Sequence, residues 1–164
     1  MASGSDPTPL SVVILGCGRV GSTLARQLSL AGHAVSIIDL TGDAFRRLGT
    51  RFKGQRVVGS GLDQDTLQRA GLDKADVFAA VTQGDNTNIM ASQLAREVFS
   101  VPRVIARIYD PIRAQAYREM GISTICTTTL AAGLIRASIV GGPEAQEWQS
   151  ALETWDQEYL QKAG

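Results

Sequence analysis

The sequence predicts an α/β protein with a doubly wound, six-stranded parallel sheet and an extra helix at its carboxyl end. Three observations support this prediction. Short apolar runs alternate with segments of helical periodicity along residues 11–140, the connections between them are short, and a glycine-rich turn follows the first run. Strands joined by helical crossovers pair in parallel, and right-handed crossovers place helices on both faces of the sheet.

The expected strands are short and rich in apolar residues. The first, residues 11–15, reads SVVIL, a continuous run typical of a strand buried on both faces. The second, residues 34–38, ends directly before Asp39. The remaining strands are expected at residues 55–58, 76–81, 103–108 and 124–126.

Helical periodicity fills the intervals between these strands. The spacing places Val20 and Leu24 on the inward face of one helix and Val98 on that of another. Asp63 is expected to cap a helix, and Pro111 lies where another begins. The expected helices cover residues 19–31, 43–48, 63–70, 86–99, 112–120 and 130–140.

The chain divides into three parts. Residues 1–10 are expected to form a flexible leader, residues 11–140 one domain, and residues 143–164 an amphipathic helix after the Gly141–Pro143 break. The apolar stripe of that helix consists of Trp148, Leu152, Trp155 and Tyr159. It could pack on its own domain or meet another subunit. We favour a subunit interface, because the sheet already has its helices.

Composition excludes several function classes. The 16 basic and 16 acidic residues cancel, so the chain has no general attraction to nucleic acid or to an anionic membrane. There is no apolar run of about 18 residues, so we expect no direct membrane insertion. Cys17 and Cys126 lack metal-ligand spacing, which predicts reduced thiols in a cytoplasmic protein and no metal site.

The glycine-rich turn has the spacing of a dinucleotide-binding motif. Gly16 permits a tight turn, Gly18 lets a phosphate approach the backbone, and Gly21 lets helix and strand pack closely. The following helix offers its N-terminal N–H groups to phosphates. Asp39, at the end of the next strand, is placed to accept hydrogen bonds from ribose hydroxyls and to repel the 2′-phosphate of NADP. The sequence therefore predicts a Rossmann-like domain that binds NAD(H) or an adenine nucleotide, namely ATP, ADP or AMP.

Further contacts should come from the carboxyl ends of the other strands, where ligands bind in such sheets. Arg107 is expected either to reach phosphates or to form a salt bridge at the sheet rim. Arg46 and Arg47 are expected on a solvated helix face. The full predicted set is Gly16, Gly18, Arg19, Val20, Gly21, Asp39, Leu40, Ser60, Gly61, Leu62, Thr82 and Arg107.

The sequence offers no catalytic residue. A dehydrogenase needs a proton donor or acceptor near the nicotinamide, yet the single histidine, His33, lies in a turn at the opposite end of the sheet. Cys17 is interpreted as a small spacer and Cys126 as a core residue. A nucleotide sensor is therefore preferred to an enzyme, with a fragment of an NAD-dependent oxidoreductase as the alternative.

Several stretches together resemble the RCK/KTN (TrkA-N) regulatory domains of potassium channels and Trk/Ktr uptake systems. They read ILGCGRVGSTLA, IIDL, VVGSGLDQDTLQRAGLDKADVFAAVTQGDNTNIMASQLAREV, VPRVIARIYDP and YREMGIS. The resemblance implies a cytoplasmic regulator that lies beneath a membrane pore subunit. It also implies assembly as a homo-oligomer, either a dimer or an octameric ring, in which ligand exchange changes the shape of the ring. By position, Gly16, Gly18, Arg19, Gly21 and Arg107 would hold phosphates, Asp39 the ribose, and Ser60, Gly61 and Leu62 the adenine.

Overall fold

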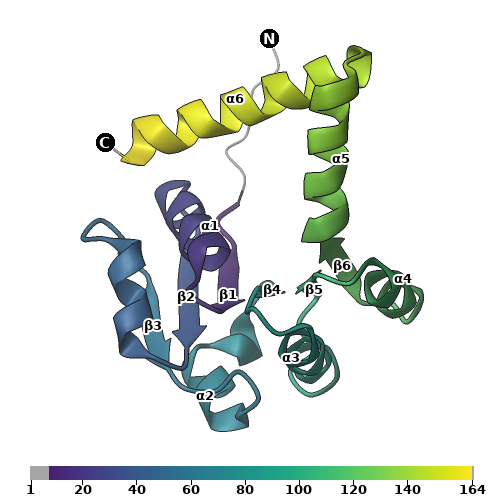
Figure 1. The fold of residues 1–164 in the computed structure, drawn as a ribbon. Coiled ribbons are helices and arrows are strands. Elements are labelled where there is room, and N and C mark those ends of the chain that lie inside the picture. Colours follow the sequence, from purple (N-terminus) through teal and green to yellow (C-terminus); the bar gives the residue numbers. More distant parts are fainter. Residues whose placement is uncertain (1–7, 164) are drawn as a thin grey trace.

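A computed structural model describes residues 8–163, apart from the side chains of residues 143, 144, 155, 156 and 158–163. Its centre is a six-stranded, all-parallel sheet in the order β3-β2-β1-β4-β5-β6 (Figure 1). The expected doubly wound fold is confirmed. The strands are β1 (Ser11–Leu15), β2 (Ala34–Asp39), β3 (Gln55–Val58), β4 (Val77–Ala80), β5 (Arg103–Ile108) and β6 (Ser123–Cys126).

Helices follow each strand, and two of them are short 3₁₀ turns. The helical elements are α1 (Arg19–Leu30), η1 (Gly42–Leu48), α2 (Gln64–Arg69), η2 (Leu72–Lys74), α3 (Asp85–Glu97), α4 (Pro111–Glu119), α5 (Thr127–Val140) and α6 (Pro143–Ala163). Figure 1 shows α5 rising from the β6 edge of the sheet and α6 crossing back above α1, which it contacts. Within residues 8–163, no helix has the length and apolar character needed to cross a bilayer.

Alternate residues of each central strand supply two separate cores. In β1, Val12 and Ile14 face α1 and η1, whereas Val13 and Leu15 face α2 and α3. This arrangement explains why β1 is apolar at every position and does not alternate with polar residues. Phe78 of β4 is fully buried, which contributes about 1.5–3 kcal/mol to the free energy of unfolding.

The inward faces of two helices differ from the prediction. Val20 is 44% exposed and Val98 is 52% exposed, so both positions were wrongly placed in the core. Val98 follows the last residue of α3. Val20 lies in the first turn of α1 and lines the cavity described below. Helical periodicity alone could not show which positions at the helix ends are left uncovered.

The leader prediction concerns mainly residues 1–7, which lie outside the described range. Leu10, at its end, donates its backbone N–H to Nδ1 of His33 at 3.1 Å. At the other end of the chain, α5 buries none of its residues in the described structure. Trp148 and Leu152 of α6 are 44% and 38% exposed, while the side chains of Trp155 and Tyr159 lie outside the described set.

Candidate functional site

A cavity of about 1010 Å³ opens at the carboxyl ends of the parallel strands. It lies across the junction of β1 and β4, the point at which the strand order reverses. Of the twelve residues predicted to bind nucleotide, all except Gly21 line this cavity. The loops after β1, β2, β3, β4 and β5 therefore bring together positions that are up to 91 residues apart, from Gly16 to Arg107.

The glycine turn has the backbone that its sequence predicts. Gly16 has φ +102°, a conformation that favours glycine, and an added Cβ would lie 3.0 Å from the backbone nitrogen of Thr82. An added Cβ on Gly21 would clash with the carbonyl oxygen of Gly16, so Gly21 lies behind the turn and serves packing. Gly18 faces open space on its Cβ side and lines the cavity. Of the three glycines in this turn, Gly18 is therefore the one that leaves room for a ligand.

Two helices open on the cavity with glycine N-caps. Gly18 precedes α1 and Gly84 precedes α3, and neither N-terminus has a side-chain cap. By contrast, Asp63 caps α2 and Asp110 caps α4, each accepting from backbone N–H groups of its own first turn. A helix N-terminus without a side-chain cap offers N–H groups and a partial positive charge to an anion.

Asp39 both lines the cavity and holds the glycine turn. Oδ2 accepts from the backbone N–H of Cys17 at 2.8 Å, and Oδ1 accepts from the backbone N–H and the hydroxyl of Thr41 at 3.0 and 3.3 Å. Oδ2 therefore keeps a lone pair that can accept a hydrogen bond from a ribose hydroxyl. Leu40 beside it is 72% exposed and Leu62 across the cavity is 39% exposed. Together they present apolar surface next to the Asp39 carboxylate, an arrangement that suits the apolar base and the ribose hydroxyls of an adenosine.

Arg107 is nearly buried, at 8% exposure, and points into the cavity. Its Nη2 donates to the carbonyl oxygen of Thr82 at 2.7 Å, and its guanidinium carbon lies 4.6 Å from the ring centroid of Tyr109. Its Nε is buried without a hydrogen-bond partner among the described residues. The salt-bridge alternative is wrong, since no carboxylate pairs with Arg107 in residues 8–163.

Thr82 lies in the cavity, but its polar atoms are already bonded within the protein. Its backbone N–H and its hydroxyl both donate to Oδ1 of Asn88, at 2.9 and 2.7 Å. Its carbonyl oxygen accepts from Asn88 Nδ2 at 3.0 Å as well as from Arg107. Thr82 therefore contributes to the shape of the cavity but offers a ligand no free hydrogen-bond donor.

Sequence reasoning missed several residues of this region. Arg46 and Arg47 are both exposed, as expected for a solvated helix face, and Arg46 pairs with Asp43 at 3.0 Å. Arg47 also lines the cavity, which the sequence did not indicate. Tyr109, Gly84 and Thr87 also line the cavity. Tyr109 lies two residues after Arg107, a spacing that could have indicated a second side chain on the same strand face.

The two cysteines lie in different surroundings. Cys17 is fully buried, and burial together with the nearby Asp39 charge raises the pKa of its thiol to about 11. Cys126 is not a core residue as expected, because it is only partly buried and its Sγ accepts from Thr129 at the start of α5. Among the described residues, no three histidine, cysteine or acidic side chains gather as metal ligands.

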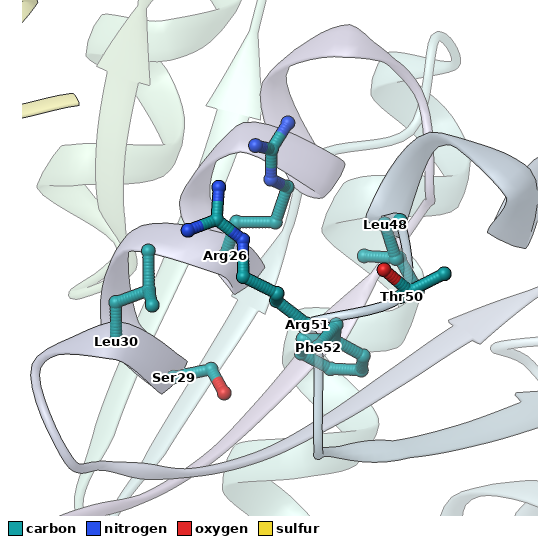
Figure 2. Close-up of a pocket in the computed structure, with 8 residues that line it drawn as sticks. Arg26, Ser29, Leu30, Leu48, Thr50, Arg51 and Phe52 are labelled. Atoms are coloured by element: carbon teal, nitrogen blue, oxygen red, sulfur yellow. The ribbon is translucent and has the colours of Figure 1, made fainter. Parts of the chain in front are cut away.

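A second, smaller cavity of about 220 Å³ lies between α1 and the segment after η1 (Figure 2). Arg26, Leu30 and Phe52 line it, and the guanidinium groups of Arg26 and Arg51 lie above it. Both arginines already have partners within the chain. The cavity has no uncapped helix N-terminus and lies away from the ends of β1 and β4, so it lacks the features of a nucleotide site.

Comparison with known proteins assigns this chain to a family. The sequence matches the TrkA-N domain family over residues 12–128, most of the chain. The chain belongs to the TrkA-N family. The match covers all five loops that line the large cavity, and it ends at the start of α5.

Relatives and solved structures agree with this assignment. The TrkA-N chain is 51% identical over 136 residues to the Trk system potassium uptake protein TrkA of Streptomyces coelicolor, covering 82% of this chain and 61% of that protein. A Kef C-terminal domain of Shewanella denitrificans, in an AMP-bound form, has a TM-score of 0.69 at 21% identity over 93% of this chain and 96% of its own. The GsuK channel bound to NAD has a TM-score of 0.60 at 21% identity over 74% of this chain and 22% of its own. The two structural likenesses show the fold. The chain spans 61% and 52% of the length of two curated relatives, from Streptomyces coelicolor and Methanothermobacter thermautotrophicus, and 23% and 22% of two longer ones.

Proposed function

We propose that this TrkA-N chain is a nucleotide-binding regulatory domain or subunit of a membrane potassium transporter or channel. The observation that carries the proposal is the pairing of an open glycine turn with a buried, cavity-facing Arg107 whose Nε lacks a partner in the described chain. The site would take the phosphates of NAD(H), ATP, ADP or AMP between these two elements, with the adenosine beside Asp39. The family assignment and the nucleotide-bound solved structures of the same fold support this ligand class.

A regulatory role is favoured over catalysis. His33, the single histidine, is bonded to Leu10 at the amino ends of the strands, far from the cavity. A curated relative that is 51% identical over 136 residues carries the name of a potassium uptake protein. We therefore infer that ligand binding acts by shifting the equilibrium between two conformations, which requires different affinities for the two. The protein would act at the cytoplasmic side of the membrane through a pore-forming partner.

We infer in addition that the chain forms a homo-oligomer through α5 and α6. In the described structure α5 is apolar yet unburied, with Ile135 at 61% and Ile139 at 79% exposure. Ile125 of the edge strand β6 is 49% exposed beside it. Surface of this kind is stabilised by burial against another chain. Light scattering on wild type and on Ile139→Asp tests this, and an unchanged molar mass would contradict it.

Calorimetric titration of the wild-type protein with NAD, NADH, AMP, ADP, ATP and NADP tests the ligand assignment. Binding of at least one ligand without a 2′-phosphate, with weaker binding of NADP, is the expected result. The absence of heat and of any thermal stabilisation with all six would overturn the proposed function.

A further inference from the structure

Asn88 is a buried amide that connects the ends of two strands. It lies on α3 with 0% exposure and does not line the cavity. Its Oδ1 accepts from the backbone N–H and the hydroxyl of Thr82, at 2.9 and 2.7 Å. Its Nδ2 donates to the carbonyl oxygens of Thr82 and Arg107, at 3.0 and 2.8 Å. Both amide hydrogens are therefore used.

These bonds lie where β4 and β5 stop pairing with each other. Their backbone pairing ends at Ala80 and Ala106, although β5 continues to pair with β6 at Arg107. Thr82 lies two residues after Ala80 and Arg107 one residue after Ala106, and the side chain of Asn88 bridges them. The amide thus extends the connection between the strands beyond the end of their ladder.

The same bonds fix the orientation of the Arg107 side chain. The Thr82 carbonyl oxygen that receives Asn88 Nδ2 also receives Arg107 Nη2 at 2.7 Å. The backbone of Arg107 is held by Asn88 through its own carbonyl. Asn88 therefore holds the acceptor that directs the guanidinium group, and together with the β6 pairing it holds the backbone from which this side chain starts.

We propose that Asn88 is a positioning residue of the nucleotide site, which presents Arg107 in advance to the phosphate groups of the ligand. This inference rests on the proposed function. An arginine that is already ordered loses little side-chain entropy on binding, so ordering Arg107 in advance raises the affinity for the ligand. Asn88 would act on the phosphate part of the ligand alone, because the adenosine end is formed by the loops after β2 and β3.

Calorimetry with ADP and with adenosine separates this role from a general contribution to folding. In Asn88→Leu, which keeps side-chain size but removes every hydrogen bond, ADP affinity should fall about 10- to 100-fold, the scale of hydrogen bonds to charged groups. Adenosine affinity should stay within about twofold. Asn88→Asp keeps the acceptor towards Thr82 but donates nothing in its ionised form, and it should show the same selective loss. This variant provides the test if the leucine variant does not fold.

Ser92→Ala is the matched control. Ser92 lies one turn further along α3, is equally buried, and its hydroxyl has no hydrogen-bond partner in the described part of the chain. Its variant should bind both ligands as wild type does. Equal losses for ADP and adenosine, or wild-type ADP affinity in both Asn88 variants, would overturn the positioning role. Wild-type protein that binds none of NAD, NADH, AMP, ADP, ATP and NADP would instead overturn the proposed function.

Discussion

The two ends of the large cavity are built in different ways. At the β1 end, the backbone forms the site through Gly16 and Gly18. At the β4–β5 end, side chains form it, since Asn88, Thr82 and Arg107 are joined by hydrogen bonds. A backbone site depends on the absence of side chains, whereas a side-chain site depends on a complete set of partners. The two ends should therefore fail differently when mutated.

The largest effect is expected at Gly21. In Gly21→Ala the new methyl group meets the carbonyl oxygen of Gly16, which is backbone and cannot move without opening the turn. We expect the free energy of unfolding to fall by about 2–3 kcal/mol, as for overpacked cores. Urea denaturation followed by circular dichroism measures this.

Gly18→Ala is the comparison for that experiment. A Cβ at Gly18 meets nothing within 4 Å, so stability should change by no more than about 0.5 kcal/mol. Because the new methyl group lies where a phosphate approaches, ADP affinity should fall nonetheless. If Gly18→Ala destabilised the fold as strongly as Gly21→Ala, the division between a packing glycine and a ligand glycine would be wrong.

At the opposite end of the cavity, Arg107→Gln should weaken ADP binding by about 1.5–3 kcal/mol, the scale of a charge-assisted hydrogen bond. Adenosine binding should change little, because it carries no phosphate. Titration calorimetry with both ligands checks this. Arg103→Gln, an exposed arginine at the start of the same strand, is the control and should bind ADP normally.

Asp39 is expected to bind the ribose of the ligand, and it also accepts the backbone hydrogen bond that holds the glycine turn. Asp39→Ala should weaken binding of ADP by about 1–3 kcal/mol through lost ribose hydrogen bonds. The variant should no longer distinguish ADP from its 2′,3′-dideoxy form, which a competition titration can show. Asp43→Ala, which removes an exposed carboxylate paired with Arg46, should retain the distinction. Continued discrimination by Asp39→Ala would contradict the ribose assignment.

The smallest effect is expected at Cys17. Burial raises the pKa of its thiol from 9.0 to about 11 in the folded protein, so the folded state disfavours the thiolate. The corresponding stability is present below pH 9.0 and is lost as pH rises towards 11. At pH 8, mass spectrometry after iodoacetamide treatment should find Cys126 modified before Cys17. Rapid labelling of Cys17 without unfolding would show that the glycine turn opens.

The sequence determined the fold to a large extent because its information is local. Apolar runs, helical periodicity and the glycine spacing specify the six strands and the turn after β1 without reference to distant residues. Asp39 could be predicted as well, since the motif fixes its separation from the turn. The same locality explains the errors at Val20 and Val98, because burial depends on what covers a helix.

Tertiary structure decided the β4–β5 end of the site. Asn88 is one of several polar residues in QGDNTN, and nothing local distinguishes the one that is buried from Asn86, which is exposed. Arg47 and Tyr109 reach the cavity only because the loops after β2 and β5 converge on one edge of the sheet. A hydrogen bond between residues 19 positions apart, such as that of Asn88 with Arg107, exists only after the sheet has brought its partners together. The sequence by itself therefore determined the glycine turn, and the packed sheet determined which side chains face it.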